Sequence, residues 1–128
     1  MKLTKLNYVD NAERVIKSMG STDRKGKPII GITTSKIRNL LSMISEIYND
    51  AMHTSGDTLN EDMQSRIVYL KMRFAYEAGR DRDVKELVEK AEIFDAINSI
   101  DNNKERLIIF CHYMEALVAY RKYYYGDN

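Results

Sequence analysis

The sequence predicts an all-α protein, a compact bundle of about five helices forming a single domain over residues 1–128. Apolar residues recur at intervals of three and four along most of the chain, and no segment shows the strict alternation of a half-buried strand. Residues that favour helix starts precede nearly every such segment. A hydrophobic fraction of 44% is enough to build a core from this chain.

The first helix is expected over residues 7–19, because its apolar residues share one face and Gly20 can end it. That face consists of Val9, Ala12, Ile16 and Met19. The second helix is expected to begin at the hydroxyl cluster of residues 33–35, which can cap it. Its apolar arc comprises Ile37, Leu40, Leu41, Ile44, Ile47, Tyr48 and Ala51.

Residues 20–31 separate these two helices and have the sequence GSTDRKGKPIIG. The segment holds three glycines and the only proline of the chain, a composition that favours a loop. It also gathers three cations, Arg24, Lys25 and Lys27. We expect a mobile loop here.

Three further helices are expected, each after a residue pair with capping-box spacing. The pairs are Thr58 with Glu61, Asp83 with Glu86, and Asn102 with Glu105. The third helix is expected to end at Gly79, the fourth to extend to Ile97, and the fifth to reach about Tyr124 before Gly126 ends it.

An arginine and tyrosine stripe runs along the third predicted helix, in the segment RIVYLKMRFAYEAGR. Arg66, Tyr69, Arg73, Tyr76 and Arg80 follow one another at intervals of three and four, so they share one face. Two apolar arcs fill most of the remaining circumference. They consist of Met63, Ile67, Leu70, Phe74 and Ala78, and of Val68, Met72, Ala75 and Gly79. We therefore expect a central helix, packed on two sides, with this Arg/Tyr stripe at its free edge.

Two interpretations of the Arg/Tyr stripe are open at this stage. The first is a solvated face in which Asp62 pairs with Arg66, and Arg73 with Glu77, at i,i+4 spacing. The second is a nucleic-acid surface, in which guanidinium groups bind phosphates while the tyrosines stack on bases or donate hydrogen bonds. Solubility needs no tyrosine, so the interleaving counts in favour of the second interpretation.

A second basic feature lies in the first turns of the second predicted helix, where Lys36 and Arg38 occur. Free N–H groups and the helix dipole favour phosphate at a helix N-terminus. Cations there oppose the dipole, and this small cost suggests a use for them. Ser42, Ser45 and Asn49 follow Arg38 on one strip and would let a nucleic-acid backbone come close, although an ordinary polar face explains them equally well.

No catalytic residue, metal site or cofactor is predicted. Cys111 and His112 are adjacent in a helix and point about 100° apart, which suits no nucleophile–base pair. One cysteine and two histidines cannot build a common structural zinc site. A single cysteine and the lack of a long apolar run lead us to expect a soluble, cytoplasmic protein without a membrane partner.

Three segments in this order, TTSKIRNLLSMISEIYND, RIVYLKMRFAYEAGR and YMEALVAYRKYYYG, resemble the small subunit of type III-A CRISPR effector complexes, the Csm family. The N-terminal segment NYVDNAERVI also fits. None of them is a catalytic signature, so the resemblance rests on their order and spacing, and it covers nearly the whole chain.

The resemblance implies an all-helical, non-catalytic subunit that acts in antiviral defence and stacks in several copies along a ribonucleoprotein filament. Such subunits face the backbone subunits that hold the guide RNA, belong to a complex with a large subunit, and contact the target strand of the guide–target duplex. The resemblance matches Lys36, Arg38 and Arg80 to this RNA contact, and supports Arg66 and Arg73 less firmly. The full set of predicted RNA-binding residues is Lys36, Arg38, Arg66, Tyr69, Arg73, Arg80 and Arg121.

Two other functions compete with this one. A helical protein–protein adaptor without nucleic-acid contact would use the Arg/Tyr stripe itself, because arginine and tyrosine are enriched in protein interfaces. A DNA-binding helix-turn-helix would use the third and fourth helices around the GRDRD turn, residues 79–83. The acidic fourth helix would then enter the major groove, which argues against this function.

Overall fold

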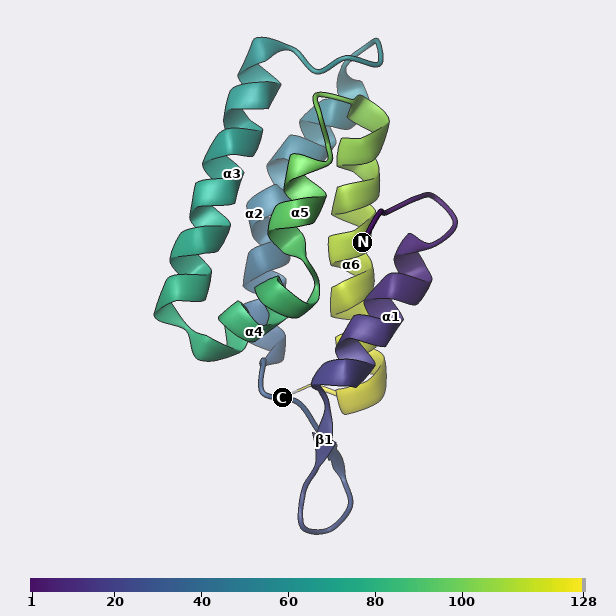
Figure 1. Cartoon of the computed structure of the whole chain (residues 1–128), viewed down its shortest axis with the longest axis vertical. Coiled ribbons are helices and arrows are strands. Elements are labelled where there is room, and N and C mark those ends of the chain that lie inside the picture. Colours follow the sequence, from purple (N-terminus) through teal and green to yellow (C-terminus); the bar gives the residue numbers. More distant parts are fainter. Residues whose placement is uncertain (128) are drawn as a thin grey trace.

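In the computed structural model, which describes residues 1–127, the chain forms helices joined mostly by short connections (Figure 1). The all-α prediction is confirmed, with six helices in place of about five and one small hairpin within these residues. The helices are α1 (Tyr8–Met19), α2 (Thr34–His53), α3 (Glu61–Arg80), α4 (Arg82–Lys90), α5 (Ile93–Asn98) and α6 (Lys104–Tyr125). The hairpin pairs β1 (Ser21–Thr22) with β2 (Pro28–Ile29) antiparallel.

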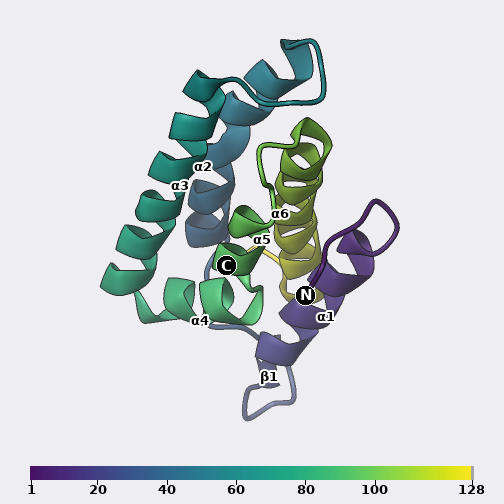
Figure 2. The ribbon, with the colours of Figure 1, turned by 45° about the horizontal axis from the view of Figure 1, so that its top comes forward.

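The central element is α6, which packs against α1 on one side and α2 on the other (Figures 1 and 2). In contrast, α3 lies at the outer edge of the bundle and contacts α2, α4 and α5. The prediction that the third helix is central and packed on two sides is therefore wrong. The face of α3 that carries Ile67, Leu70 and Phe74 is buried, whereas its other apolar arc faces solvent.

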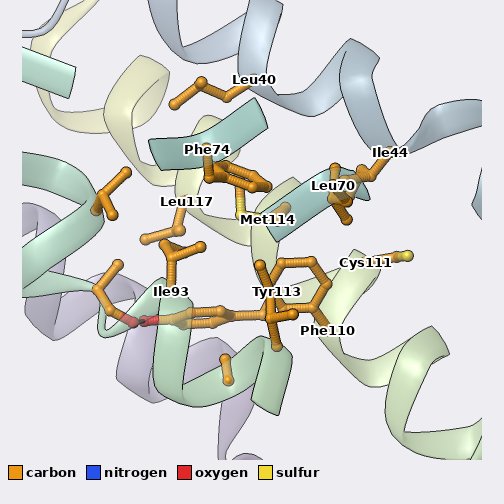
Figure 3. Close-up of a cluster of buried hydrophobic side chains, with 14 of the residues drawn as sticks. Leu40, Ile44, Leu70, Phe74, Ile93, Phe110, Cys111, Tyr113, Met114 and Leu117 are labelled. Carbon is orange, nitrogen blue, oxygen red and sulfur yellow. Dashed lines mark hydrogen bonds between the residues drawn. The ribbon is translucent and has the colours of Figure 1, made fainter. Parts of the chain in front are cut away.

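The core gathers buried side chains from all six helices. Figure 3 shows the part of it where labelled side chains of α2, α3, α5 and α6 meet. Phe74 of α3 meets Phe110 of α6 edge to face, with ring centroids 6.4 Å apart. The hydroxyl of Tyr113 donates a buried hydrogen bond of 2.9 Å to the carbonyl of Ala91. This bond gives the buried tyrosine hydroxyl a hydrogen-bond partner inside the core, so the hydroxyl needs no water.

Helix starts were predicted correctly in kind but not always at the right residue. Thr33 caps α2 as expected, its hydroxyl accepting from the backbone N–H of Lys36 at 3.2 Å. Asn60, not Thr58, caps α3 by accepting from the N–H of Met63 at 2.9 Å. Thr58 instead forms an isolated bridge to the start of α6. The expected Thr58 cap is wrong because this bridge holds Thr58 two residues before Asn60, the residue that caps the helix.

The caps of α4 and α6 are each displaced from the predicted residue. Asp81 caps α4, and its Oδ1 accepts from the N–H groups of Asp83 and Val84 at 2.9 and 3.2 Å. Asn103 caps α6 by accepting from the N–H of Arg106 at 3.0 Å. In both places two or more Asx residues stand close together, and local spacing does not say which one adopts the extended cap conformation.

The predicted fourth helix, expected to extend to Ile97, is divided into α4 and α5. The break lies at Glu92, whose backbone is left-handed with φ of 52°. The Tyr113 hydroxyl bonds the carbonyl of Ala91 directly before this residue. The apolar spacing is maintained across the break and no glycine or proline marks it, so periodicity alone does not reveal it.

Residues 21–29 of the expected loop between the first two helices form a short antiparallel hairpin, which the sequence did not predict. The turn is closed by the N–H of Asp23, which donates to the carbonyl of Lys27 at 2.9 Å. Gly26 takes a φ of 81° there, a conformation that glycine adopts without strain. Oδ1 of Asp23 also accepts from the N–H groups of Lys25 and Lys27 at 2.8 and 2.9 Å.

Candidate nucleic-acid interface

The Arg/Tyr stripe lies on the outer face of α3. Tyr69 and Tyr76 are 56% and 61% exposed, Arg80 is exposed, and Arg66 and Arg73 are half-buried. Three of these residues meet in one groove between α2 and α3. The groove is lined by Met43, Glu46, Ile47, Arg66, Tyr69, Leu70 and Arg73. The helical spacing therefore predicted correctly that these side chains share one surface.

The ion pairs of the stripe differ from the i,i+4 pairs expected for a solvated face. Arg66 pairs with Asp50 of α2, with Nη1 and Oδ2 2.7 Å apart, instead of Asp62. Glu77 pairs with Arg80 at 3.7 Å instead of Arg73, since it lies one turn before the end of the helix. The Arg80 guanidinium also lies 5.7 Å from the centre of the Tyr76 ring, so an aromatic face supports it.

An exposed apolar band lies beside the stripe on α3. Val68 and Met72 are 71% and 56% exposed, and Ala75 and Gly79 are exposed next to them. These four residues were expected to be packed, but within residues 1–127 no element covers this side of α3. An exposed apolar band of this kind is typical of a surface that another macromolecule covers.

The start of α2 holds one paired cation and one unpaired cation. Nζ of Lys36 lies 2.8 Å from Oδ2 of Asp81 and 3.7 Å from Asp83. The hydrogen bond between Lys36 and Asp81 raises the pKa of Lys36 and lowers the pKa of Asp81. Arg38 is exposed and forms no ion pair within residues 1–127. Arg38 is therefore better placed than Lys36 to bind an external phosphate.

The two basic features predicted from the sequence, at the start of α2 and at the end of α3, lie at the same end of the bundle. The Lys36–Asp81 ion pair joins the start of α2 to the junction between α3 and α4, so Arg38 and Arg80 both lie at this end (Figures 1 and 2). Arg82, the first residue of α4, is also exposed there. Sequence reasoning missed Arg82, although it follows Arg80 in the same GRDRD turn.

Arg121 does not belong to this surface. It is only 1% exposed, and its Nε donates to the carbonyl of Ile32 at 2.9 Å while Nη1 donates to the carbonyl of Gly126 at 2.8 Å. Burial lowers the pKa of its guanidinium. The prediction that Arg121 binds RNA conflicts with this burial, and we assign the residue a structural role.

The side chains with catalytic potential are engaged in packing. Cys111 is buried, and burial raises the pKa of its thiol to about 12. Nε2 of His112 lies 3.2 Å from the Tyr48 hydroxyl, in contact with the rings of Tyr8 and Tyr48. Within residues 1–127, no cluster of three or more His, Cys, Asp and Glu side chains suited to a metal ion occurs, and no helix is long and apolar enough to cross a membrane.

Comparison with known proteins gives one consistent result. The family described as Csm2 Type III-A matches residues 10–127. A protein of Streptococcus thermophilus named CRISPR system Cms protein Csm2 is 47% identical over 126 residues, which cover 98% of each chain. The protein of that name from Mycobacterium tuberculosis is 35% identical, over 96% of this chain and 95% of its own. The Enterococcus italicus protein of that name is 39% identical, over 80% of this chain and 77% of its own.

Proposed function

The chain belongs to the Csm2 family, the small subunits of the type III-A CRISPR complex, and we propose that it contacts the target RNA of that complex. In this proposal it is a non-catalytic, cytoplasmic subunit, several copies of which stack along the ribonucleoprotein filament in antiviral defence. The basic residues bind the phosphate backbone of the target strand in the guide–target duplex. The chain thereby positions RNA that other subunits select and process.

The observation that carries this proposal is the pair of exposed arginines at one end of the bundle. Arg38 has no ion pair within residues 1–127, and the guanidinium of Arg80 is held over Tyr76 with its side chain 63% exposed. Each copy offers few such contacts, so an isolated subunit binds RNA weakly, and the salt slope grows with the number of cations that contact phosphate. Stacked copies along one RNA raise the overall affinity through multivalency.

The remaining predicted residues would contribute less to phosphate binding than Arg38 and Arg80. Arg66 and Arg73 share their groove with Glu46, and Arg66 is already paired with Asp50, so each gains less from a phosphate. Tyr69 borders the same groove and would stack on a base or pack against a partner. Lys36 would have to share its charge with Asp81.

Partner subunits would cover the apolar band of α3. Val68 and Met72 are exposed in the isolated chain, although their burial would be favourable in an assembly. The near-neutral formal charge of +1 also suits a protein that stacks on copies of itself. We propose contacts with neighbouring copies and with the backbone and large subunits, without assigning the band to one of them.

The same band favours a second candidate function, a protein-only adaptor inside the complex. In that case α3 would bind protein along both the apolar band and the Arg/Tyr stripe. The two functions differ in whether RNA touches this chain at all.

Ultraviolet crosslinking of the native complex tests the proposal. The complex is purified on a tag on this chain, loaded with target RNA, irradiated and digested, and RNA-bearing peptides are identified by mass spectrometry. We expect crosslinked peptides from residues 34–53 and 69–82. Crosslinks confined to other subunits, in a complex that holds guide RNA, would favour the adaptor.

A further inference from the structure

We propose that the β1–β2 hairpin is a further phosphate-binding element, which extends the basic surface of Arg38 and Arg80 beyond the bundle. The ligand is the backbone of the same target RNA, so this inference rests on the proposed function. None of the hairpin's cations belongs to the RNA-binding set predicted from the sequence.

The charge of the hairpin is the first argument. Arg24, Lys25 and Lys27 are all exposed, and none forms an ion pair within residues 1–127. The only acid of the hairpin, Asp23, has one carboxylate oxygen engaged by two backbone N–H groups of the turn. Residues 20–32 thus carry three cations and one anion, a formal +2, whereas the whole chain carries +1.

The second argument is that the turn presents these cations in a fixed arrangement. The backbone bond between Asp23 and Lys27, the glycine turn at Gly26 and the Asp23 side chain hold the tip together. The backbone at these cations is therefore already ordered before RNA binds. Pre-organisation lowers the entropic cost of binding.

The third argument is that both ends of the hairpin are held against the bundle. Ile32, which follows the hairpin, accepts the hydrogen bond from the buried Arg121. On the other side, Gly20 lies so close to Tyr125 that an added Cβ would stand 1.8 Å from the tyrosine hydroxyl oxygen. An added Cβ on Gly31 would lie 2.6 Å from an Asp83 oxygen. The hairpin therefore projects in a defined direction, from the end of the bundle that carries Arg38 and Arg80 (Figures 1 and 2).

The composition of the tip favours a phosphate ligand over a protein partner. Two of its three cations are lysines, which are depleted in protein–protein interfaces. Lysine and arginine supply many of the phosphate contacts in nucleic-acid complexes. Only Ile29 gives the hairpin an exposed large apolar side chain, at 36% exposure. An acidic protein surface is the competing partner, and the experiment separates the two.

The test compares reconstituted complexes that carry three variants of this chain. The hairpin variant is Arg24→Ala, Lys25→Ala and Lys27→Ala. The matched control is Lys2→Ala, Lys85→Ala and Lys90→Ala, which removes three exposed cations elsewhere. The reference variant is Arg38→Ala with Arg80→Ala. Assembly is measured by native mass spectrometry, and the target-RNA Kd is measured at several salt concentrations.

We expect the hairpin variant to assemble normally, to bind target RNA several-fold more weakly at ~0.1 M salt, and to lower the salt slope of log K by about one or more. The control should match wild type. Wild-type affinity and slope for the hairpin variant, with weaker binding by Arg38→Ala and Arg80→Ala, would overturn the hairpin inference and leave the proposed function standing. Wild-type binding by both the hairpin variant and the Arg38→Ala with Arg80→Ala variant would overturn the hairpin inference and the proposed function together. Failure of the hairpin variant to join the complex, while its thermal unfolding is unchanged, would identify a protein partner instead.

Discussion

Nε of Arg121 donates a hydrogen bond of 2.9 Å to the backbone carbonyl of Ile32, joining two positions 89 residues apart in the chain. Ile32 is fully buried and lies between the hairpin and the start of α2. The end of α6 therefore fixes both the base of the hairpin and the helix that carries Arg38. The position of the basic surface therefore depends on Arg121, a buried cation that is not part of that surface.

Replacing Arg121 by alanine is expected to lower the free energy of unfolding by about 3 kcal/mol, because the buried carbonyl of Ile32 loses its charged donor and the large buried side chain leaves a cavity. Thermal or urea unfolding of the isolated chain measures this. The adjacent Lys122→Ala, which removes an exposed ion pair to Asp127, should change stability by less than about 0.5 kcal/mol. If Arg121→Ala left stability unaltered and weakened RNA binding, the sequence-based prediction that Arg121 binds RNA would be favoured instead.

Helix capping by Asn60 gives a second prediction. Asn60→Ala should destabilise the protein by about 1 kcal/mol, since the N–H of Met63 loses its acceptor. Thr58→Ala is the matched control, because the bridge from Thr58 to Asn103 uses backbone atoms and survives truncation of the side chain. Chemical denaturation of both variants compares them. A larger loss for Thr58→Ala would favour the capping box predicted from the sequence.

The pH dependence of stability should reveal the Lys36–Asp81 ion pair. Because the pKa of Asp81 is lowered in the fold, its carboxylate stabilises the protein above the unfolded pKa of ~3.9, and this contribution is lost as pH falls through the folded value. Asp81→Asn retains a capping side chain but loses the charge. It should be less stable than wild type at neutral pH, and the difference should shrink as pH falls through the folded pKa of Asp81. A urea-midpoint difference that stays constant with pH would contradict this prediction.

The thiol of Cys111 should be inert in the folded protein. Its pKa is raised to about 12 and the side chain is buried, so at pH 8 little thiolate is present and none is accessible. Reaction with Ellman's reagent should be more than about 100-fold slower in native protein than in urea. Equal rates in the two conditions would show that the core around Cys111 opens readily.

The sequence indicated the helices well because their amphipathic periodicity reflects burial directly. It did not indicate which helix is central. Val68 and Met72 looked like a second packed arc of α3, yet they face solvent. Apolar residues around most of the circumference of α6, from Leu107 to Leu117, were the better signal, since such a helix is surrounded.

The remaining errors arise from tertiary contacts that local spacing does not encode. The break at Glu92 lies beside the carbonyl that the Tyr113 hydroxyl binds, from another helix. The hairpin is ordered by its own turn and by Arg121 and Tyr125, about a hundred residues later. For the candidate site, spacing correctly placed the Arg/Tyr stripe on one surface, but ion pairing separated Arg38 from Lys36 and burial excluded Arg121.

The central claim is that Arg38 and Arg80 bind target-RNA phosphates, and its most direct test is the target-RNA Kd of the reconstituted complex across salt concentrations. Arg38→Glu with Arg80→Glu is compared with Lys85→Glu with Lys90→Glu, a matched reversal of two exposed cations on α4. We predict that the arginine variant assembles normally, binds at least about tenfold more weakly at ~0.1 M salt, and has a smaller salt slope, while the control matches wild type. Unchanged affinity and slope in a fully assembled complex would contradict the account.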